Sequence, residues 1–71
     1  MHRFDGQKIR EAREGAHLSQ EQLARLLGTG VRNVSRWETG VNEPRFSHVV
    51  MIARATGRPL GFFQPDVQDA A

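Results

Sequence analysis

Apolar residues recur at helical spacing along most of this chain, and no stretch alternates apolar with polar residues as a half-buried strand would. The pattern therefore predicts an all-α protein. The first helix is expected over residues 6–14, with Asp5 as its N-cap and Gly15 as its C-terminal stop. Phe4 and Ile9 flank the start of this helix at the spacing of a hydrophobic staple.

The second predicted helix has the clearest start. Ser19 followed by Gln22 has the spacing of a capping box, which places the helix over residues 20–27. Gly28 follows directly, where a residue in the left-handed conformation commonly ends a helix. The four apolar residues expected to face the core are Leu23, Ala24, Leu26 and Leu27.

A third helix is predicted over residues 31–38, and Gly40 closes it. Only residues 28–30 separate this helix from the second one, and this link contains two glycines. A short, glycine-bearing link between two short helices is the signature of a helix-turn-helix.

The third helix has two chemically different sides. Val34 and Trp37 fall on one side, where we expect them in the core, and Arg32 and Arg36 fall on the other. The outward side carries no acid before Glu38. A helix with this width and charge can enter the major groove of B-DNA, where arginine pairs with O6 and N7 of guanine.

A fourth helix is predicted over residues 46–55 after a polar loop, with Gly57 as its stop. A last helical turn is expected over residues 60–63. Phe62 and Phe63 are adjacent on this turn and cannot both point inward. We therefore expect one of them to close the core and the other to be a candidate interface residue.

The chain has 71 residues, enough for one small domain. We assign the domain to residues 1–63, because residues 64–71 have too little apolar content to pack and are expected to be a disordered tail. No apolar run approaches the roughly 20 residues that span a bilayer, and the start resembles no signal peptide. These features predict a cytoplasmic protein with no membrane association.

The charge and the residue composition indicate which kinds of partner and ligand the chain can bind. Ten Lys and Arg against eight Asp and Glu give a net charge of +2, and all ten cations lie in residues 1–60. Nine of the ten are arginine, whose planar head group suits guanine edges and phosphates, although a high-GC codon bias would produce the same preference. Cysteine is absent and the three histidines lie far apart, so we expect no metal site and no cofactor.

The run SQEQLARLLGTGVRNVSRWETG, from Ser19 to Gly40, resembles the Cro/repressor-type (XRE, lambda-repressor-like) helix-turn-helix family. The resemblance extends over about residues 6–63 and includes the W-E pair at 37 and 38. It implies a compact five-helix DNA-binding domain whose second and third helices form the helix-turn-helix. Pro59 and Gly61 lie where relatives have a longer last helix, which points to a single turn here.

The resemblance also implies roles for individual residues. The base-contacting positions are Val31, Arg32, Ser35 and Arg36. The phosphate-contacting positions are Gln20, Asn33, Thr39 and Arg45. A structural salt bridge is implied between Arg13 and Glu38.

The function implied is that of a sequence-specific, double-stranded-DNA-binding transcriptional regulator, a repressor associated with the nucleoid. Its expected partners are operator DNA, with a homodimer on a palindromic site and a protein partner as further options. The alternative is an antitoxin-type protein-interaction module that also binds its own operator. An enzyme is not expected, because the sequence has no carboxylate cluster and no glycine-rich phosphate loop.

Overall fold

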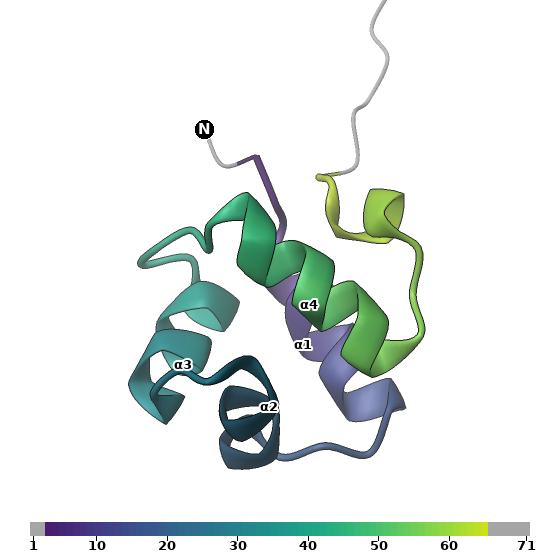
Figure 1. Cartoon of the computed structure of the whole chain (residues 1–71). Helices are drawn as coiled ribbons and strands as arrows, with labels where there is room; N and C mark the ends of the chain where they lie inside the picture. Colours follow the sequence, from purple (N-terminus) through teal and green to yellow (C-terminus); the bar gives the residue numbers. More distant parts are fainter. Residues whose placement is uncertain (1–2, 66–71) are drawn as a thin grey trace, which may run out of the picture.

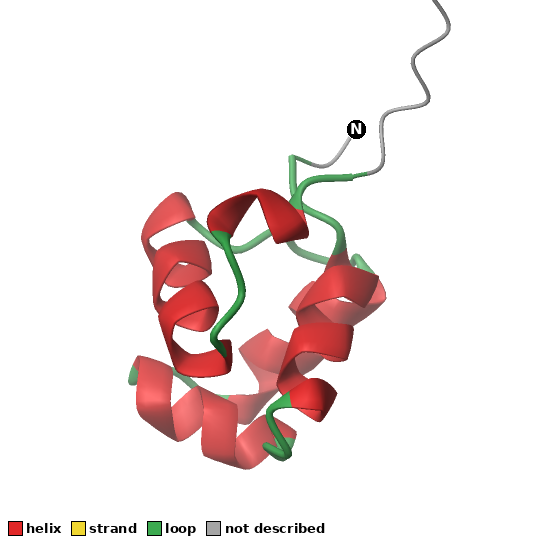
Figure 2. Ribbon diagram, turned by 90° about the vertical axis from the view of Figure 1, so that its right-hand side faces the viewer, coloured by secondary structure: helices red, strands yellow, loops and turns green. Residues whose placement is uncertain are grey.

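The computed structural model describes residues 3–65, which form four α-helices and one 3₁₀ turn (Figures 1 and 2). The elements are α1 (Gly6–Gly15), α2 (Gln20–Leu27), α3 (Val31–Thr39), α4 (Phe46–Thr56) and η1 (Leu60–Phe63). The described part contains no strand, and none of its helices is long and apolar enough to cross a membrane. The tail expected at 64–71 lies, from residue 66 onward, outside the described residues.

The first two helices begin as the sequence predicts. The Asp5 carboxylate accepts a hydrogen bond of 2.9 Å from the backbone N–H of Gln7. In the capping box, the Gln22 N–H donates to the Ser19 hydroxyl oxygen at 3.0 Å, and the Ser19 N–H donates to the Gln22 side-chain oxygen at 2.8 Å. The capping box therefore fixes the entry into α2.

Glycines in the left-handed conformation end α2, α3 and α4, as expected. Gly28, Gly40 and Gly57 have φ angles of 70°, 81° and 73°. The end of α1 differs from the prediction, because Gly15 is still helical and His17 takes the left-handed conformation, with φ 60°. The chain therefore turns toward α2 two residues later than the glycine indicates.

The fifth helix of the expected architecture is only a 3₁₀ turn, η1. Pro59 precedes it, and the turn ends after four residues. Phe63 is fully buried, whereas Phe62 is half-buried. Cations cover the Phe62 ring, with the Lys8 ammonium 5.1 Å and the Arg58 guanidinium 4.8 Å from its centroid, so this candidate interface residue is not a free apolar contact.

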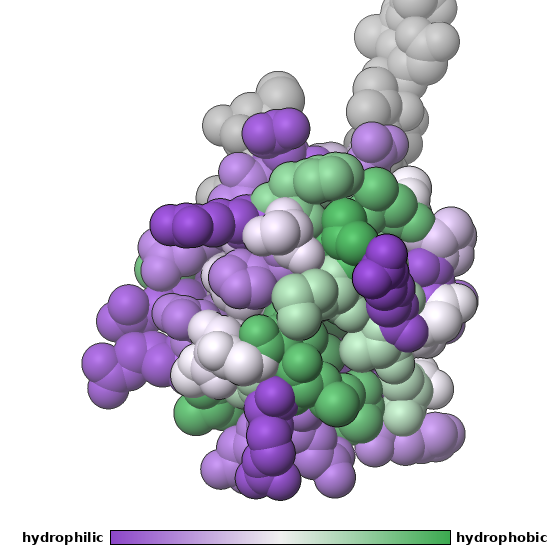
Figure 3. All heavy atoms as spheres, viewed as in Figure 1, coloured by the Kyte–Doolittle hydropathy of each residue, from purple (hydrophilic) through white to green (hydrophobic). Residues whose placement is uncertain are grey.

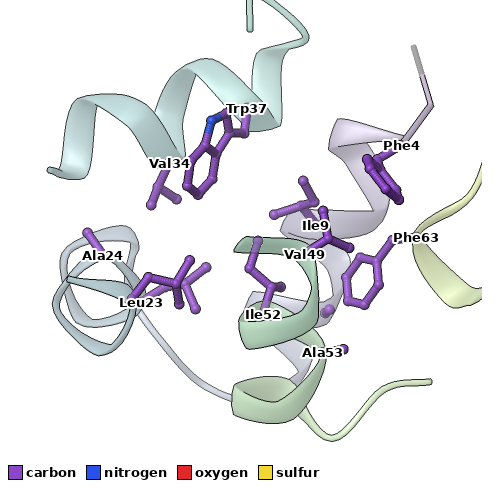
Figure 4. Close-up of a cluster of buried hydrophobic side chains, with 12 residues drawn as sticks. Phe4, Ile9, Leu23, Ala24, Val34, Trp37, Val49, Ile52, Ala53 and Phe63 are labelled. Carbon is purple, nitrogen blue, oxygen red and sulfur yellow. The ribbon is translucent and has the colours of Figure 1, made fainter. Parts of the chain in front are cut away.

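The core lies where all five elements meet (Figure 4). Val34 and Trp37 point from α3 toward Leu23 of α2 and toward Ile52 of α4, which confirms the inward side predicted for the third helix. Phe63 closes the far end of this core beside α1 and α4. The two helices of the helix-turn-helix, α2 and α3, are thus supported by α1, α4 and η1.

One predicted core residue is on the surface. Leu26 is 58% exposed, whereas its helix neighbours Leu23 and Leu27 are buried. Leu23 and Leu27 are four residues apart and share one side of α2, while Leu26 lies a quarter-turn away from Leu27. The expectation of a four-residue inner side was therefore wrong for Leu26.

The start of α1 packs against the end of α3 so closely that Gly6 has no room for a side chain. A Cβ atom at this position would overlap the carbonyl oxygen of Trp37 and lie 2.9 Å from that of Glu38. The backbone of Gly6 has no positive φ angle, so glycine is needed here for close approach rather than for conformation.

Candidate nucleic-acid interface

The outer side of α3 is open to solvent over its whole length. Val31, Arg32, Asn33 and Arg36 are exposed, and Ser35 is half-buried between them. On the opposite side, Val34 is 0% and Trp37 6% exposed. The structure therefore brings the four predicted base-contacting residues to one surface and keeps the indole away from it.

No acid neutralises the two arginines of this surface. Within residues 3–65, neither the Arg32 nor the Arg36 guanidinium has a hydrogen-bond or ion-pair partner. Figure 3 shows hydrophilic side chains projecting on the side where Figure 1 places α3, and hydrophobic surface over α4. The outer side of α3 is therefore available to an anionic partner.

The turn before α3 fixes where this side begins. The N–H of Thr29 donates to the Ala24 carbonyl oxygen at 2.9 Å, which closes the turn after Gly28. The Asn33 side-chain amide donates to the Thr29 hydroxyl oxygen at 2.8 Å, so the first turn of α3 is tied to the link. Gly30 caps α3 without a side-chain hydrogen bond.

The N-terminus of α2 lies beside the end of α3. Gln20 is half-buried there, and its side-chain nitrogen donates to an oxygen of Glu38 at 3.0 Å. The first backbone N–H groups of a helix have no intrahelical acceptor and favour an anion. The sequence could not reveal the contact between Gln20 and Glu38, because it depends on how the two helices cross.

The salt bridge between Arg13 and Glu38 is present and bidentate. Arg13 Nε lies 2.6 Å from one Glu38 oxygen, and its Nη2 lies 3.1 Å from the other. Arg13 Nη1 also donates to the Leu18 carbonyl oxygen at 2.8 Å. The hydrogen bond to Glu38 raises the pKa of Arg13, which outweighs the opposite effect of burial. The pair therefore joins α1 to the end of α3 with both charges satisfied.

The two remaining predicted phosphate contacts lie around the loop after α3. Thr39 is exposed, but its hydroxyl donates to carbonyl oxygens of its own helix, those of Ser35 at 3.0 Å and Arg36 at 3.3 Å. Arg45 is exposed at the N-cap of α4, and its guanidinium has no partner within residues 3–65.

Glu43 is a site residue that sequence reasoning missed. Its carboxylate accepts hydrogen bonds from the backbone N–H groups of Arg3 and Phe4, the latter at 2.9 Å. These bonds anchor the loop that carries Arg45 to the segment before α1. No sequence signal marks a carboxylate that binds backbone groups about 40 residues away, since the pairing exists only in the folded chain.

The comparison with known families agrees with this geometry. A family model described as helix-turn-helix matches residues 9–63. The chain belongs to the helix-turn-helix family. The matched residues include the whole of the α2–α3 unit together with α4 and η1.

Relatives of this helix-turn-helix chain are named as regulators. An uncharacterized transcriptional regulator in the ATPase CF(0) region of Rhodospirillum rubrum is 33% identical over 63 residues, which are 89% of this chain and 58% of that protein. An uncharacterized HTH-type transcriptional regulator of Rickettsia prowazekii is 30% identical and is covered over 52% of its length. The chain thus spans about half the length of these two relatives.

Solved structures share the fold of this helix-turn-helix chain. The restriction-modification controller protein C.AhdI from Aeromonas hydrophila has a TM-score of 0.73 at 32% identity, covering 80% of this chain and 86% of that one. The P22 c2 repressor, solved with a synthetic operator, has a TM-score of 0.76 at 22% identity, covering 86% and 94%. HppE has a TM-score of 0.75 at 28% identity, but only 34% of that longer chain is covered, against 84% of this one.

Proposed function

We propose that this chain is a sequence-specific, double-stranded-DNA-binding transcriptional repressor that reads the major groove with the outer side of α3. The observation that carries the proposal is the pair of unpartnered guanidinium groups, Arg32 and Arg36, on the exposed side of a helix whose other side is locked into the core. An α-helix fits the major groove of B-DNA, and arginine is the commonest reader of guanine there. Such a protein would act on DNA of the nucleoid, in the cytoplasm.

Each base-facing position has a chemistry suited to one kind of base. Arg32 and Arg36 suit guanine O6 and N7, and exposed Val31 suits the methyl group of thymine. Ser35, half-buried between them, can donate or accept a hydrogen bond. This set favours an operator with guanines separated by a short distance on one face of the duplex.

Phosphate contacts would fix the register of α3 on the duplex. Gln20 and the backbone amides at the start of α2 are suited to one phosphate, and Arg45 to another across the loop. Asn33 keeps an amide N–H free after its bond to Thr29. Thr39 is a weaker candidate, because its hydroxyl proton is already bonded within α3.

A homodimer on a palindromic operator is part of the proposal. Exposed apolar side chains on α4 and η1, those of Phe46, Met51 and Leu60, are available for contact with a second copy. The P22 c2 repressor, which was solved on an operator, shares this fold. Two copies would read half-sites about 34 Å apart, one turn of the duplex. Binding of this kind would repress by blocking a promoter.

Selection from a library of random duplexes tests the proposal. We expect enrichment of a guanine-containing site, preferably with two-fold symmetry, and an affinity that falls steeply with salt because bound phosphates release counterions. The selected duplex should remain intact on prolonged incubation, which separates binding from nuclease activity. Recovery of no preferred sequence at any salt concentration would contradict sequence-specific binding.

A further inference from the structure

The carboxylate of Glu38 joins three helices at one point. One oxygen accepts from Arg13 Nε of α1 at 2.6 Å, and the other accepts from Arg13 Nη2 at 3.1 Å and from Gln20 Nε2 of α2 at 3.0 Å. Glu38 itself is buried, in the last turn of α3. The residue therefore links the helix that carries the base-facing residues to the N-terminus of α2.

The hydrogen bond from Gln20 has a defined polarity. A carboxylate only accepts hydrogen bonds, so the amide nitrogen of Gln20, and not its oxygen, must face Glu38. One of the two amide N–H groups is used in this contact, and the other remains for a second acceptor. An unanchored glutamine on a helix surface would instead rotate freely and present either end of its amide.

We infer that Glu38 is a positioning residue for DNA binding, which orients the Gln20 amide before the duplex arrives so that its second N–H meets a phosphate. The inference rests on the proposed function. It gives Glu38 a role in binding in addition to its structural salt bridge with Arg13. Ordering a long side chain on binding weakens affinity, so an amide oriented in advance strengthens it about threefold to tenfold.

Arg13 is needed for this arrangement for an electrostatic reason. A buried carboxylate beside a phosphate would repel it, since screening by salt is weak for partly buried charges. The bidentate guanidinium of Arg13 neutralises Glu38 while leaving one of its oxygens able to accept from Gln20. The Arg13–Glu38–Gln20 chain therefore presents a hydrogen-bond donor to DNA without presenting a negative charge.

The test compares two double variants, both of which lack the buried charges of Arg13 and Glu38 and serve as backgrounds for a third substitution. In Arg13→Met/Glu38→Gln the residue at 38 keeps an oxygen that can accept from Gln20, and in Arg13→Met/Glu38→Met it does not. Both backgrounds lose the same bond from Arg13 to the Leu18 carbonyl, so that loss cancels. Gln20→Ala is then introduced into each, and binding is measured on the selected duplex and on a scrambled duplex of equal length.

We expect Gln20→Ala to weaken binding of both duplexes about threefold to tenfold in the Met/Gln background and to have little effect in the Met/Met background. Base preference should not change in either. Equal losses in the two backgrounds would overturn the inference while leaving the proposed function intact. Absence of duplex binding by the unaltered protein would overturn both.

A second measurement needs no duplex and no replacement of the ion pair. In NMR spectra of the free protein, the two side-chain amide protons of Gln20 should be widely separated and slow to exchange, because one is bonded to Glu38. The amide of Gln7, an exposed glutamine that makes no side-chain hydrogen bond in residues 3–65, serves as the control. Gln20 protons that behave like those of Gln7 would overturn the inference.

Discussion

The rest of the molecule covers one side of α3 and leaves the other side exposed. On the inner side, Val34 and Trp37 are in the core, and both oxygens of the Glu38 carboxylate accept hydrogen bonds. On the outer side, Val31 is 41% exposed and the Arg36 guanidinium has no partner in residues 3–65. One helix of nine residues thus divides into a side that stabilises the fold and a side left for a ligand.

Arg13 of α1 and Arg36 of α3 show the same contrast between a side chain used in the fold and one left exposed. Arg13 uses three of its nitrogens in bonds to Glu38 and Leu18, whereas Arg36 uses none. Because hydrogen bonding to Glu38 raises the pKa of Arg13, the contribution of this cation to stability is fully present below the ordinary arginine pKa. Arg13 should therefore add no pH dependence to unfolding near neutrality.

Substitutions on the inner side of α3 should alter the stability of the fold, and substitutions on its outer side should alter the affinity for DNA.

The largest effect is expected when one member of the buried pair is removed. Arg13→Met leaves the Glu38 carboxylate buried with only Gln20 as a donor, and we expect a loss of about 3–5 kcal/mol in the free energy of unfolding. Urea unfolding followed by Trp37 fluorescence and by circular dichroism measures it.

The double variant Arg13→Met/Glu38→Met is the control, because replacing both charges with apolar side chains is often neutral or stabilising. It should regain most of the stability lost in Arg13→Met. A single variant as stable as the unaltered chain would show that the pair is not held in the geometry described.

A smaller loss is expected from Gly6→Ala, which tests the contact between α1 and the end of α3. The added methyl group must displace the backbone of α3, and overpacking of this kind costs about 1–3 kcal/mol. Gly61→Ala is the matched control, because a Cβ atom at Gly61 would meet nothing within 4 Å. Thermal melts that rank the two variants equally would refute the close approach at Gly6.

On the outer side, Arg36→Ala should reduce affinity for the selected duplex by about 1–3 kcal/mol and relax the preference at one base pair. Its free energy of unfolding should stay within about 0.5 kcal/mol of the unaltered value, as for exposed residues without partners. Gln20→Ala should instead weaken all duplexes by similar factors.

Arg54→Ala controls for the loss of one positive charge, because Arg54 is exposed on α4, away from the face of α3. Fluorescence anisotropy titrations on matched and mismatched duplexes distinguish the three variants. If Arg36→Ala weakens every sequence equally, Arg36 contacts phosphate and does not read a base.

The smallest effect is expected at Leu26. Because its side chain is 58% exposed, Leu26→Ala should change the free energy of unfolding by no more than about 0.5 kcal/mol. The fully buried Leu23 provides the contrast, since Leu23→Ala should cost about 2–5 kcal/mol. Comparable losses in the two variants would place Leu26 in the core, as the sequence alone indicated.

Sequence reasoning succeeded at most positions where structure is determined locally, with the exception of the end of α1, where His17 and not Gly15 takes the left-handed conformation. The capping box at Ser19 and the left-handed glycines at 28, 40 and 57 depend on neighbouring residues, and they place α2 and the ends of three helices correctly. It failed where the outcome depends on packing. Leu26 is as apolar as Leu23, and only the position of the other helices determines which of them is covered.

The candidate site, like the fold, could be predicted from the sequence only in part. The outward side of α3 followed from helical geometry, and the pairing of Arg13 with Glu38 followed from family resemblance. The bond from Gln20 to Glu38, the anchoring of the loop by Glu43 and the close approach at Gly6 join residues 18 to 40 positions apart. Contacts over such separations depend on the crossing of helices, which no local pattern in one sequence encodes.

The central claim is that DNA binds on the outer side of α3, and an NMR titration of the ¹⁵N-labelled protein with the selected duplex tests it most directly. The account predicts that the backbone amides of residues 31–36 and of Gln20 shift most, together with the guanidinium signals of Arg32 and Arg36. Perturbations confined to α4 and η1, with the signals of α3 unchanged at saturating duplex, would contradict it.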